Sequence, residues 1–243
     1  DLLGTFDHRA SDGTPIDAQD VQLNAVSTGQ QARSFVSVLP WGDFAAAWVS
    51  TYSSGSDSSG LSVQARRFGR PTIPVTSASG GTGGPGCTLR DAITAANSGS
   101  ATGGCPAGND GAVIELPPGS LIELTELDND SNGLPRIERS VTVRGHGATI
   151  ARDSALACPM GSDFRLFEAA AGGNLTLEDL TIANGCAPAG SGGGILSSGG
   201  SVILRRSTIE GNEAGVGGGI AVSGGNLLAF DSTVRRNLAG WRG

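Results

Sequence analysis

Lysine is absent from the sequence, and histidine and aromatic residues are scarce. All 16 basic residues are arginine, which excludes chemistry that needs a lysine Schiff base or a lysine general base. The only histidines are His8 and His146, too few for a histidine-rich zinc centre. The sequence also lacks the Gly-x-Ser-x-Gly elbow of many serine hydrolases. Aromatic residues make up only 5% of the chain, which argues against a sugar-binding groove lined by rings.

Long apolar runs and excess positive charge are also missing. No run approaches the roughly 20 apolar residues that a membrane helix needs, so we expect no membrane span. A net charge of -7 and a pI near 4.8 exclude a basic surface for nucleic acid. The chain opens on DLLGTFD without a signal-peptide pattern, and we expect any export signal to be missing.

What the sequence does contain is a repeat of about 25 residues. The tetrapeptide GGGI occurs at 192–195 and again at 217–220. The asparagines that end IEGN and VRRN, Asn212 and Asn237, keep the same interval. A fixed period of this size is typical of solenoids, in which each repeat forms one coil.

Short apolar runs, each three or four residues long, follow one another from residue 112 onward. Aligning 174–185, 201–212 and 226–237 places Leu175, Val202 and Leu227 in register, and Ile182, Ile209 and Val234 likewise. Strands this short are unstable alone and must stack. We therefore predict a parallel β-helix with glycine at its corners, where positive φ or close approach is needed.

Asn212 and Asn237 fall at equivalent corners of the predicted coils. Stacked side-chain amides there would hydrogen-bond to one another and to the turns, as in cross-β ladders. The alternative is that they are ordinary left-handed turn residues. Either role is structural.

Residues 88–97 contain the one strong helix signal. Thr88 suits an N-cap with Asp91 in the first turn, and Leu89, Ile93 and Ala96 share one face. A helix of about three turns before a series of strands would cap an apolar end of the β-helix.

The chain divides into three parts. Residues 1–70 alternate apolar and polar residues in four runs separated by turn clusters, which predicts four strands of an antiparallel β meander. Residues 71–86 are rich in Pro, Gly, Ser and Thr and suit a linker. Residues 87–243 form the predicted β-helix. Because the chain begins within an apparent repeat and stops at NLAGWRG, where another corner is due, we expect a fragment of a longer protein, truncated at the C-terminus.

Four cysteines favour disulfides, because their spacings do not suit a zinc site. Disulfides imply an oxidising compartment, such as the periplasm, the cell surface or the medium. Cys158 and Cys186 lie 28 residues apart, about one coil, so we infer that they are stacked neighbours.

These motifs resemble a known class of exported bacterial proteins. CTLRDAITAAN resembles the CSLREA signature that opens many exported right-handed β-helix proteins, with Thr88 in place of serine and Asp91 in place of glutamate. The GGGI and IEGN/VRRN repeats are similar to the GGA-I and F-x-x-N repeats of polymorphic outer membrane proteins. The resemblance covers about residues 87–243 and includes the segments 105–108, 132–152, 164–167 and 175–185.

The resemblance implies a right-handed helix of coils, export, and a surface or secreted setting, and it brings no catalytic residues. It also implies that Cys87 pairs with Cys105 and so ties the capping helix to the first coil. Residues 1–70 resemble the repeated β modules ending in A-Q-R-F-D of large bacterial surface proteins, here QARRFG.

DNDSNG is the strongest candidate for a metal site. Asp128, Asp130 and Asn132 precede a glycine as in the first half of a calcium loop. An EF-hand is excluded, because Arg139 stands where its last position needs glutamate. Calcium would stiffen the loop, whereas the alternative is a solvated turn.

Two functions are compatible with the sequence. The first is a non-catalytic structural or adhesive module that presents a surface to a glycan or cell-surface ligand. The alternative is a polysaccharide lyase or glycoside hydrolase with acids on the lateral face. Candidate acids near the first coils are Glu123, Glu126, Asp128, Asp130 and Asp153, but nothing in the sequence marks two of them as a pair. The first function is therefore favoured.

Overall fold

The computed structural model describes residues 5–6, 21–22, 31–38, 44–51, 61–68, 70–81, 85–159 and 163–240. The chain forms two units, Asp1–Arg70 and Pro71–Gly243. His8 lies outside the described residues.

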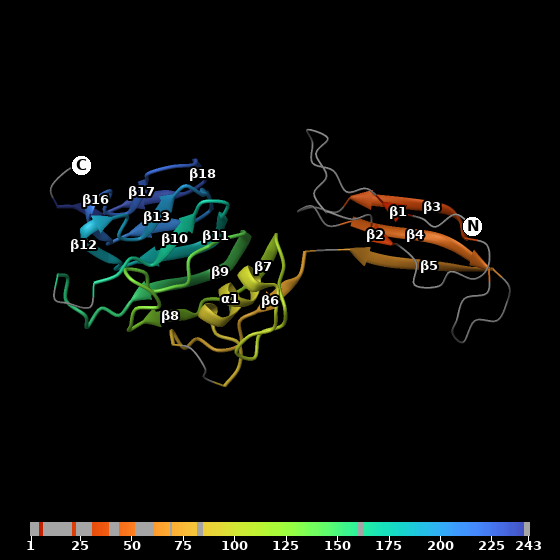
Figure 1. Ribbon diagram of the computed structural model, residues 1–243, viewed down its shortest axis with the longest axis horizontal. Helices are drawn as coiled ribbons and strands as arrows, with labels where there is room; N and C mark the ends of the chain where they lie inside the picture. Colours follow the sequence, from red (N-terminus) through yellow and green to blue (C-terminus); the bar gives the residue numbers. More distant parts are fainter. Residues whose placement is uncertain are drawn as a thin grey trace. The chain divides into compact units, whose positions relative to one another are not determined.

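The described elements are β-strands with one α-helix (Figure 1). In chain order they are β1 Thr5–Phe6, β2 Val21–Gln22, β3 Gln31–Val38, β4 Phe44–Thr51, β5 Leu61–Phe68, β6 Thr72–Pro74, α1 Leu89–Ser98, β7 Ala112–Glu115, β8 Leu121–Leu124, β9 Ser140–Arg152, β10 Phe167–Ala170, β11 Asn174–Ala183, β12 Cys186–Ser191, β13 Ile195–Ser198, β14 Ser201–Arg205, β15 Thr208–Glu210, β16 Glu213–Val216, β17 Ile220–Val222, β18 Leu227–Phe230, β19 Thr233–Arg235 and β20 Leu238–Ala239.

The first unit is antiparallel, as the alternation predicts. Strands β3, β4 and β5 form a three-stranded meander. The prediction of a fourth strand in that meander is wrong, because β2 pairs with β1 in a separate antiparallel ladder. Ala46 on β4 is buried, whereas Phe35 on β3 and Val63 on β5 are exposed.

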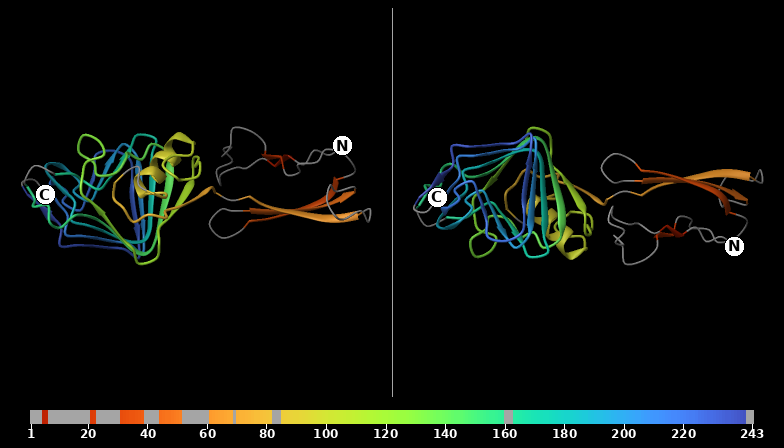
Figure 2. Two further views of the ribbon diagram at one scale, coloured as in Figure 1. Left: turned by 90° about the horizontal axis from the view of Figure 1, so that it is seen from below. Right: turned by 90° about the horizontal axis from the view of Figure 1, so that it is seen from above.

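The second unit is a parallel β-helix, which confirms the predicted fold. Its largest sheet runs β18-β14-β11-β9-β7-β6, and two three-stranded sheets, β10-β13-β17 and β12-β16-β20, close the coils. Figure 2 shows successive coils, coloured from green to blue, lying on one another. All strand pairs in these sheets are parallel.

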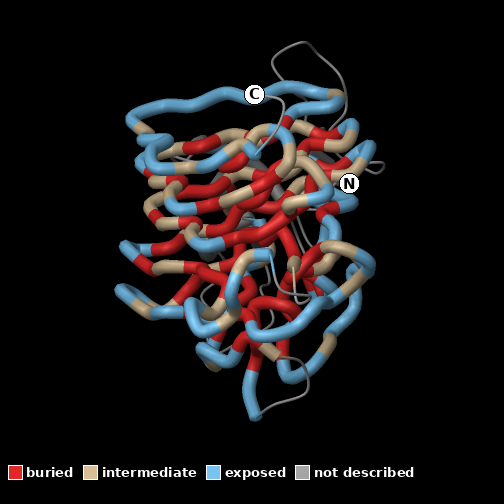
Figure 3. Tube along the Cα trace, turned by 90° about the vertical axis from the view of Figure 1, so that its left-hand side faces the viewer, coloured by how far each residue is buried: buried red, intermediate tan, exposed pale blue. Residues whose placement is uncertain are grey.

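The apolar rows of the alignment form the core. Leu175 pairs with Val202 and Val202 with Leu227. In the second row, Ile182 pairs with Ile209 and Ile209 with Val234. The inward residues of β14 and β15, Val202, Leu204 and Ile209, are fully buried. Figure 3 shows buried residues through the middle of the stack and exposed residues along the coil nearest the C-terminus. Val234, in contrast, is 55% exposed where its neighbour Ile209 is 0% exposed. The final described coil therefore presents core positions to solvent.

The GGGI repeat forms one corner of the coils. Gly192 and Gly217 have φ of 66° and 59°, the left-handed region that glycine adopts without strain. A Cβ atom on Gly193 would lie 2.3 Å from the carbonyl oxygen of Glu213. Positive φ and close coil spacing thus both require glycine here.

The asparagines form the predicted ladder. Asn212 Nδ2 donates to Asn237 Oδ1 at 3.0 Å, and Asn212 Oδ1 accepts from the backbone N–H of Gly185 at 2.9 Å. The alternative of left-handed turn residues is wrong, because the positive φ at this corner belongs to Gly211 and Arg236. Each amide therefore joins its own coil to the neighbouring one.

Helix α1 lies at the β6–β8 end of the stack (Figure 1). Thr88 caps it by accepting from the Asp91 backbone N–H, and Gly99 ends it in the left-handed conformation. Leu89 and Ile93 are buried as predicted, but Arg90 is also only 3% exposed, because its guanidinium binds backbone carbonyls of Gly80 and of the 126–127 segment. At ten residues, this helix is too short to cross a membrane, and none in the described parts of the chain is long and apolar enough to do so.

The prediction of a linker over residues 71–86 is wrong for 71–81. Strand β6 pairs in parallel with β7, and Ile73 and Val75 are 0% and 4% exposed. The strand is hard to predict from composition, because Pro71 precedes it, Pro74 lies between Ile73 and Val75, and the pairing partner lies about 40 residues away. The β-helix therefore begins at Pro71.

Both disulfides are present, and they join Cys87 to Cys105 and Cys158 to Cys186. The pairs confirm the two predicted connections. Cys158 and Cys186 are not at equivalent coil positions, however. Cys158 follows Ile150 by eight residues and Cys186 follows Ile182 by four, although Ile150 and Ile182 are paired.

Removing the first bridge should destabilise the capping helix. We expect the double substitution Cys87→Ser with Cys105→Ser to lower the free energy of unfolding by about 3 kcal/mol, because the bridge closes a loop in the unfolded chain. Urea unfolding followed by circular dichroism would measure the change. An unchanged midpoint would show that the helix is held by its packing alone.

Candidate functional site

Charged side chains form a row on the outer face of the largest sheet. Glu115, Arg144, Glu178 and Arg205 stand at directly paired positions of β7, β9, β11 and β14. Paired residues of in-register parallel strands point to the same side of the sheet, so acids and bases alternate along the stack. Arg144 Nη1 lies 2.5 Å from Glu115 Oε1, and Arg144 Nε lies 3.2 Å from Glu178 Oε2.

A second row occupies the adjacent corner. His146 and Asp179 lie within β9 and β11, Arg206 and Asp231 directly follow β14 and β18, and all four have positive φ, between 48° and 54°. Arg206 Nη2 lies 2.7 Å from the second carboxylate oxygen of Glu178. His146 Nε2 lies 2.7 Å from Glu115 Oε2. The half-exposed pair of Glu115 and His146 thus lies beside Glu178, which is held between two arginines.

Glu178 is held as a carboxylate. Burial alone would raise its pKa, but hydrogen bonds from Arg206 and Arg144 and the charges of both arginines outweigh burial and lower the pKa below 4.5. A glycoside hydrolase needs one carboxylic acid with a raised pKa to protonate the leaving group. Glu178 is tuned in the opposite direction, which suits a structural ion pair.

A buried cluster surrounds Glu168 on β10. Its Oε2 accepts from Asn132 Nδ2 at 2.9 Å and lies 3.4 Å from Arg165 Nη1 and 3.3 Å from Arg136 Nε. Its Oε1 accepts from Ser198 Oγ at 2.7 Å. Because Asn132 and Arg136 belong to the segment between β8 and β9, the cluster fastens this long segment to the strands of the following coils.

The pKa values within this cluster follow from the same contacts. Burial would raise the pKa of Glu168, but the hydrogen bonds from Ser198 and Asn132 and the charges of Arg136 and Arg165 lower it below 4.5. Burial lowers the pKa of Arg165, and the charge of Glu168 partly restores it. Glu168 is therefore charged at neutral pH.

Acid should destabilise the fold through Glu168 and Glu178. Both have a folded pKa below the unfolded one, so the stabilisation is complete above the ordinary value of 4.5 and is lost as the pH falls through the lower folded value. We expect the free energy of unfolding to fall below about pH 4.5, and to fall less steeply in Glu168→Gln. Urea titrations across the acid range would test this, and equal stability at pH 3 and pH 6 would contradict it.

The predicted calcium residues each face a different arginine. Asp128 Oδ1 lies 3.5 Å from Arg90 Nη1, and Asp130 Oδ2 lies 3.2 Å from Arg136 Nη2. Asn132 is fully buried, and its Oδ1 accepts from Arg165 Nη1 at 3.0 Å. Arg90 and Arg165, which are distant in the sequence, and Arg136, six residues after Asp130, thus supply the positive charge that the sequence pattern assigns to calcium. Calcium binding stays a prediction, and an ion here would have to displace these contacts.

Calcium should therefore leave the unfolding temperature unchanged. Arginines already pair with Asp128 and Asp130. Millimolar Ca²⁺ therefore adds little electrostatic stabilisation to this loop. Thermal unfolding in CaCl₂, in MgCl₂ and in EDTA would measure the effect. A rise of several degrees specific to calcium, lost in Asp128→Asn, would restore the calcium site.

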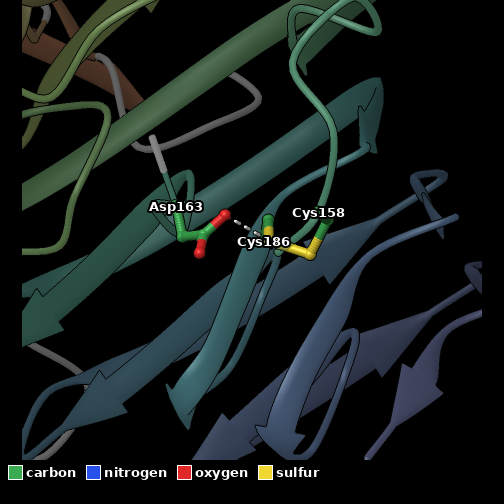
Figure 4. A group of neighbouring side chains, drawn as sticks. All are labelled: Cys158, Asp163 and Cys186. Carbon is green, nitrogen blue, oxygen red and sulfur yellow. Dashed lines mark hydrogen bonds between the residues drawn. A yellow bond between two sulfur atoms is a disulfide. The ribbon is translucent and has the colours of Figure 1, made fainter. Parts of the chain in front are cut away.

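Glu123, Glu126 and Asp153 belong to no metal-binding group of three or more His, Cys, Asp or Glu side chains among the described residues. One group of three His, Cys, Asp or Glu side chains there has ligand atoms within 4.8 Å of one another, and it contains neither Glu123, Glu126 nor Asp153. That group is Cys158, Asp163 and Cys186 (Figure 4). Asp163 Oδ1 lies 3.1 Å from Cys186 Sγ. In the disulfide form neither sulfur is a thiolate, so this group holds no metal in that state.

The charged clusters could not be predicted from the sequence, because their members are distant in the chain. Glu178 and Arg144 are separated by 34 residues, and Glu168 and Arg136 by 32. The available signal was an acidic or basic residue at the same place in successive coils, as in Arg144, Glu178 and Arg205 of the aligned strands.

Searches against protein-family models, curated proteins and solved structures find no match to this chain.

Proposed function

We propose that the chain is a non-catalytic scaffold of the structural or adhesive type, exported by a bacterium and acting in a secreted or cell-surface setting. The observation that carries the proposal is the alternating row of acids and arginines along the outer sheet. Arg144 pairs with both Glu115 and Glu178 across neighbouring coils, and Arg206 at the adjacent corner pairs with the other oxygen of Glu178. A catalytic face would instead need titratable groups tuned to give and take protons.

Two further observations support this proposal. Two disulfides are expected for an oxidising compartment and tie both the capping end and the middle of the stack. The resemblance of residues 87–243 to exported bacterial β-helix proteins favours the same setting. A stiff solenoid suits the task of holding a binding surface for a glycan or a cell-surface ligand.

Binding of the purified chain to glycans, matrix proteins and cells would test the adhesive part of the proposal. We expect saturable binding to at least one surface by the native chain and none by the reduced, urea-unfolded chain. Arg206→Ala is a useful surface variant, because its guanidinium is half exposed and lies on the outer rows. If no surface binds, the adhesive role fails.

The alternative, a polysaccharide lyase or glycoside hydrolase, is favoured by one observation. Glu115 and His146 form a half-exposed pair at 2.7 Å on the lateral face, beside Arg144. We expect no release of reducing ends or unsaturated products from a panel of neutral and acidic polysaccharides. Turnover that is lost in Glu115→Gln and in His146→Asn, but retained in Glu210→Gln on the same sheet, would favour the enzyme over the scaffold.

A further inference from the structure

We propose that the Cys158–Cys186 bridge, when reduced, becomes a binding site for a thiophilic divalent cation such as Zn²⁺, with Asp163 as the third ligand. The ligand atoms of the three residues already lie within 4.8 Å of one another. In tetrahedral zinc sites with Zn–S near 2.3 Å and Zn–O near 2.1 Å, ligand atoms are about 3.6 Å apart. The two sulfurs need only separate to about that distance to enclose an ion.

Hydrogen bonds hold the three ligands in place without the disulfide. Arg152 donates to the carbonyl oxygens of Leu156 and Ala157 at 2.7 and 2.8 Å, which fixes the segment immediately before Cys158. The backbone N–H of Cys186 donates to the carbonyl of Phe164 at 2.9 Å, which keeps Cys186 beside Asp163 (Figure 4).

The charges also suit a cation. Two thiolates and one carboxylate would surround the ion, and Arg152 Nη2 lies 3.8 Å from Asp163 Oδ1, near enough to balance the remaining negative charge. Cys186 is fully buried, so its thiolate gains from a metal partner. Three protein ligands leave the fourth position of a tetrahedral ion to water.

The chemistry balances in two steps. A dithiol reductant supplies two electrons and two protons, the S–S bond breaks, and the reductant becomes a disulfide. The cation then displaces two thiol protons to solvent as both thiolates bind. The segment after β9 is thus tied to β12 by a covalent bond in an oxidising setting and by a metal ion in a reducing one.

The other disulfide provides a control within the same chain. Beside Cys87 and Cys105 the sulfurs contact the backbone carbonyl of Thr88, at 3.8 and 3.7 Å. That bridge belongs to no group of three ligand side chains in the described part of the chain. It should therefore not form a comparable cation site.

Cobalt titration of the whole 243-residue chain tests the proposal. The chain is reduced with a phosphine, which takes the oxygen of water and leaves two thiols, and Co²⁺ and then Zn²⁺ are added without oxygen. We expect one equivalent of Co²⁺ with a thiolate charge-transfer band, its displacement by Zn²⁺, and release of two protons per ion. Asp163→Asn should weaken binding about tenfold or more.

The variants separate this site from the rest of the chain. Cys87→Ser with Cys105→Ser should keep the band, whereas Cys158→Ser with Cys186→Ser should abolish it. A band that survives the second pair, unchanged affinity in Asp163→Asn, or no binding would overturn the proposal. If reduction alone unfolds the β-structure, circular dichroism should recover with Zn²⁺ in the parent but not in Asp163→Asn, and failure to recover would also overturn it.

Discussion

Replacing Glu168 by alanine should lower the free energy of unfolding by about 4 kcal/mol, because removal of one partner leaves a buried charge without compensation. Arg165 and Asn132 are 9% and 0% exposed, and both make contacts with the Glu168 carboxylate. The loss should appear in urea unfolding at neutral pH, where the carboxylate is charged.

Glu210→Ala is the matched control for Glu168→Ala. Glu210 also pairs with an arginine, Arg235, at 2.8 Å, but the arginine side chain is 54% exposed. Exposed pairs contribute at most about 1 kcal/mol. Equal losses in the two variants would show that the Glu168 cluster does not fasten the β8–β9 segment. Replacing both Glu168 and Arg165 by methionine should cost less than the two single changes together.

Asn212→Ala should cost a similar amount, about 4 kcal/mol, because it leaves two buried backbone groups unsatisfied at about 2 kcal/mol each. These groups are the N–H of Gly185 and the carbonyl of Ile182. Because each coil of a solenoid is stabilised mainly by its neighbours, amide exchange should rise first in the coils around Asn212. Hydrogen exchange with urea unfolding would measure both effects.

Asn237→Ala serves as the control for the ladder. Asn237 lies one coil later and donates to the carbonyl of Ile209, but it is only half-buried, so solvent can replace its bonds. We expect a loss of about 1 kcal/mol. A loss as large as that of Asn212→Ala would mean that solvent exposure does not weaken the ladder.

The β-helix itself could be predicted because the same types of residue recur in the sequence at the period of one coil. Val202 and Leu227, or Ile209 and Val234, are 25 residues apart and occupy the same place in successive coils. The helix over 88–97 was predictable for a similar reason, since Thr88 and Gly99 are local capping signals. Periodicity and caps are short-range features that one sequence carries in full.

The contacts of the charged residues could not be predicted in the same way. Asp128 and Asn132 have the spacing of calcium ligands, yet Arg90 and Arg165, 38 and 33 residues away, take up their oxygens. Strand β6 was hidden likewise, because its partner β7 follows only after the helix. Whether a polar side chain binds an ion, solvent or another side chain depends on the coil that folds beside it.

The two bridges also determine how the chain would respond to a pulling force. Backbone bonds between coils lie along the stack, so tension at the ends would peel coils away one at a time. The segments enclosed by the bridges, with separations of 18 and 28 residues, cannot lengthen while the sulfurs are joined. At about 3.5 Å per extended residue, they withhold about 60 Å and about 100 Å of extension, which a reductant would release in a single-molecule stretching experiment.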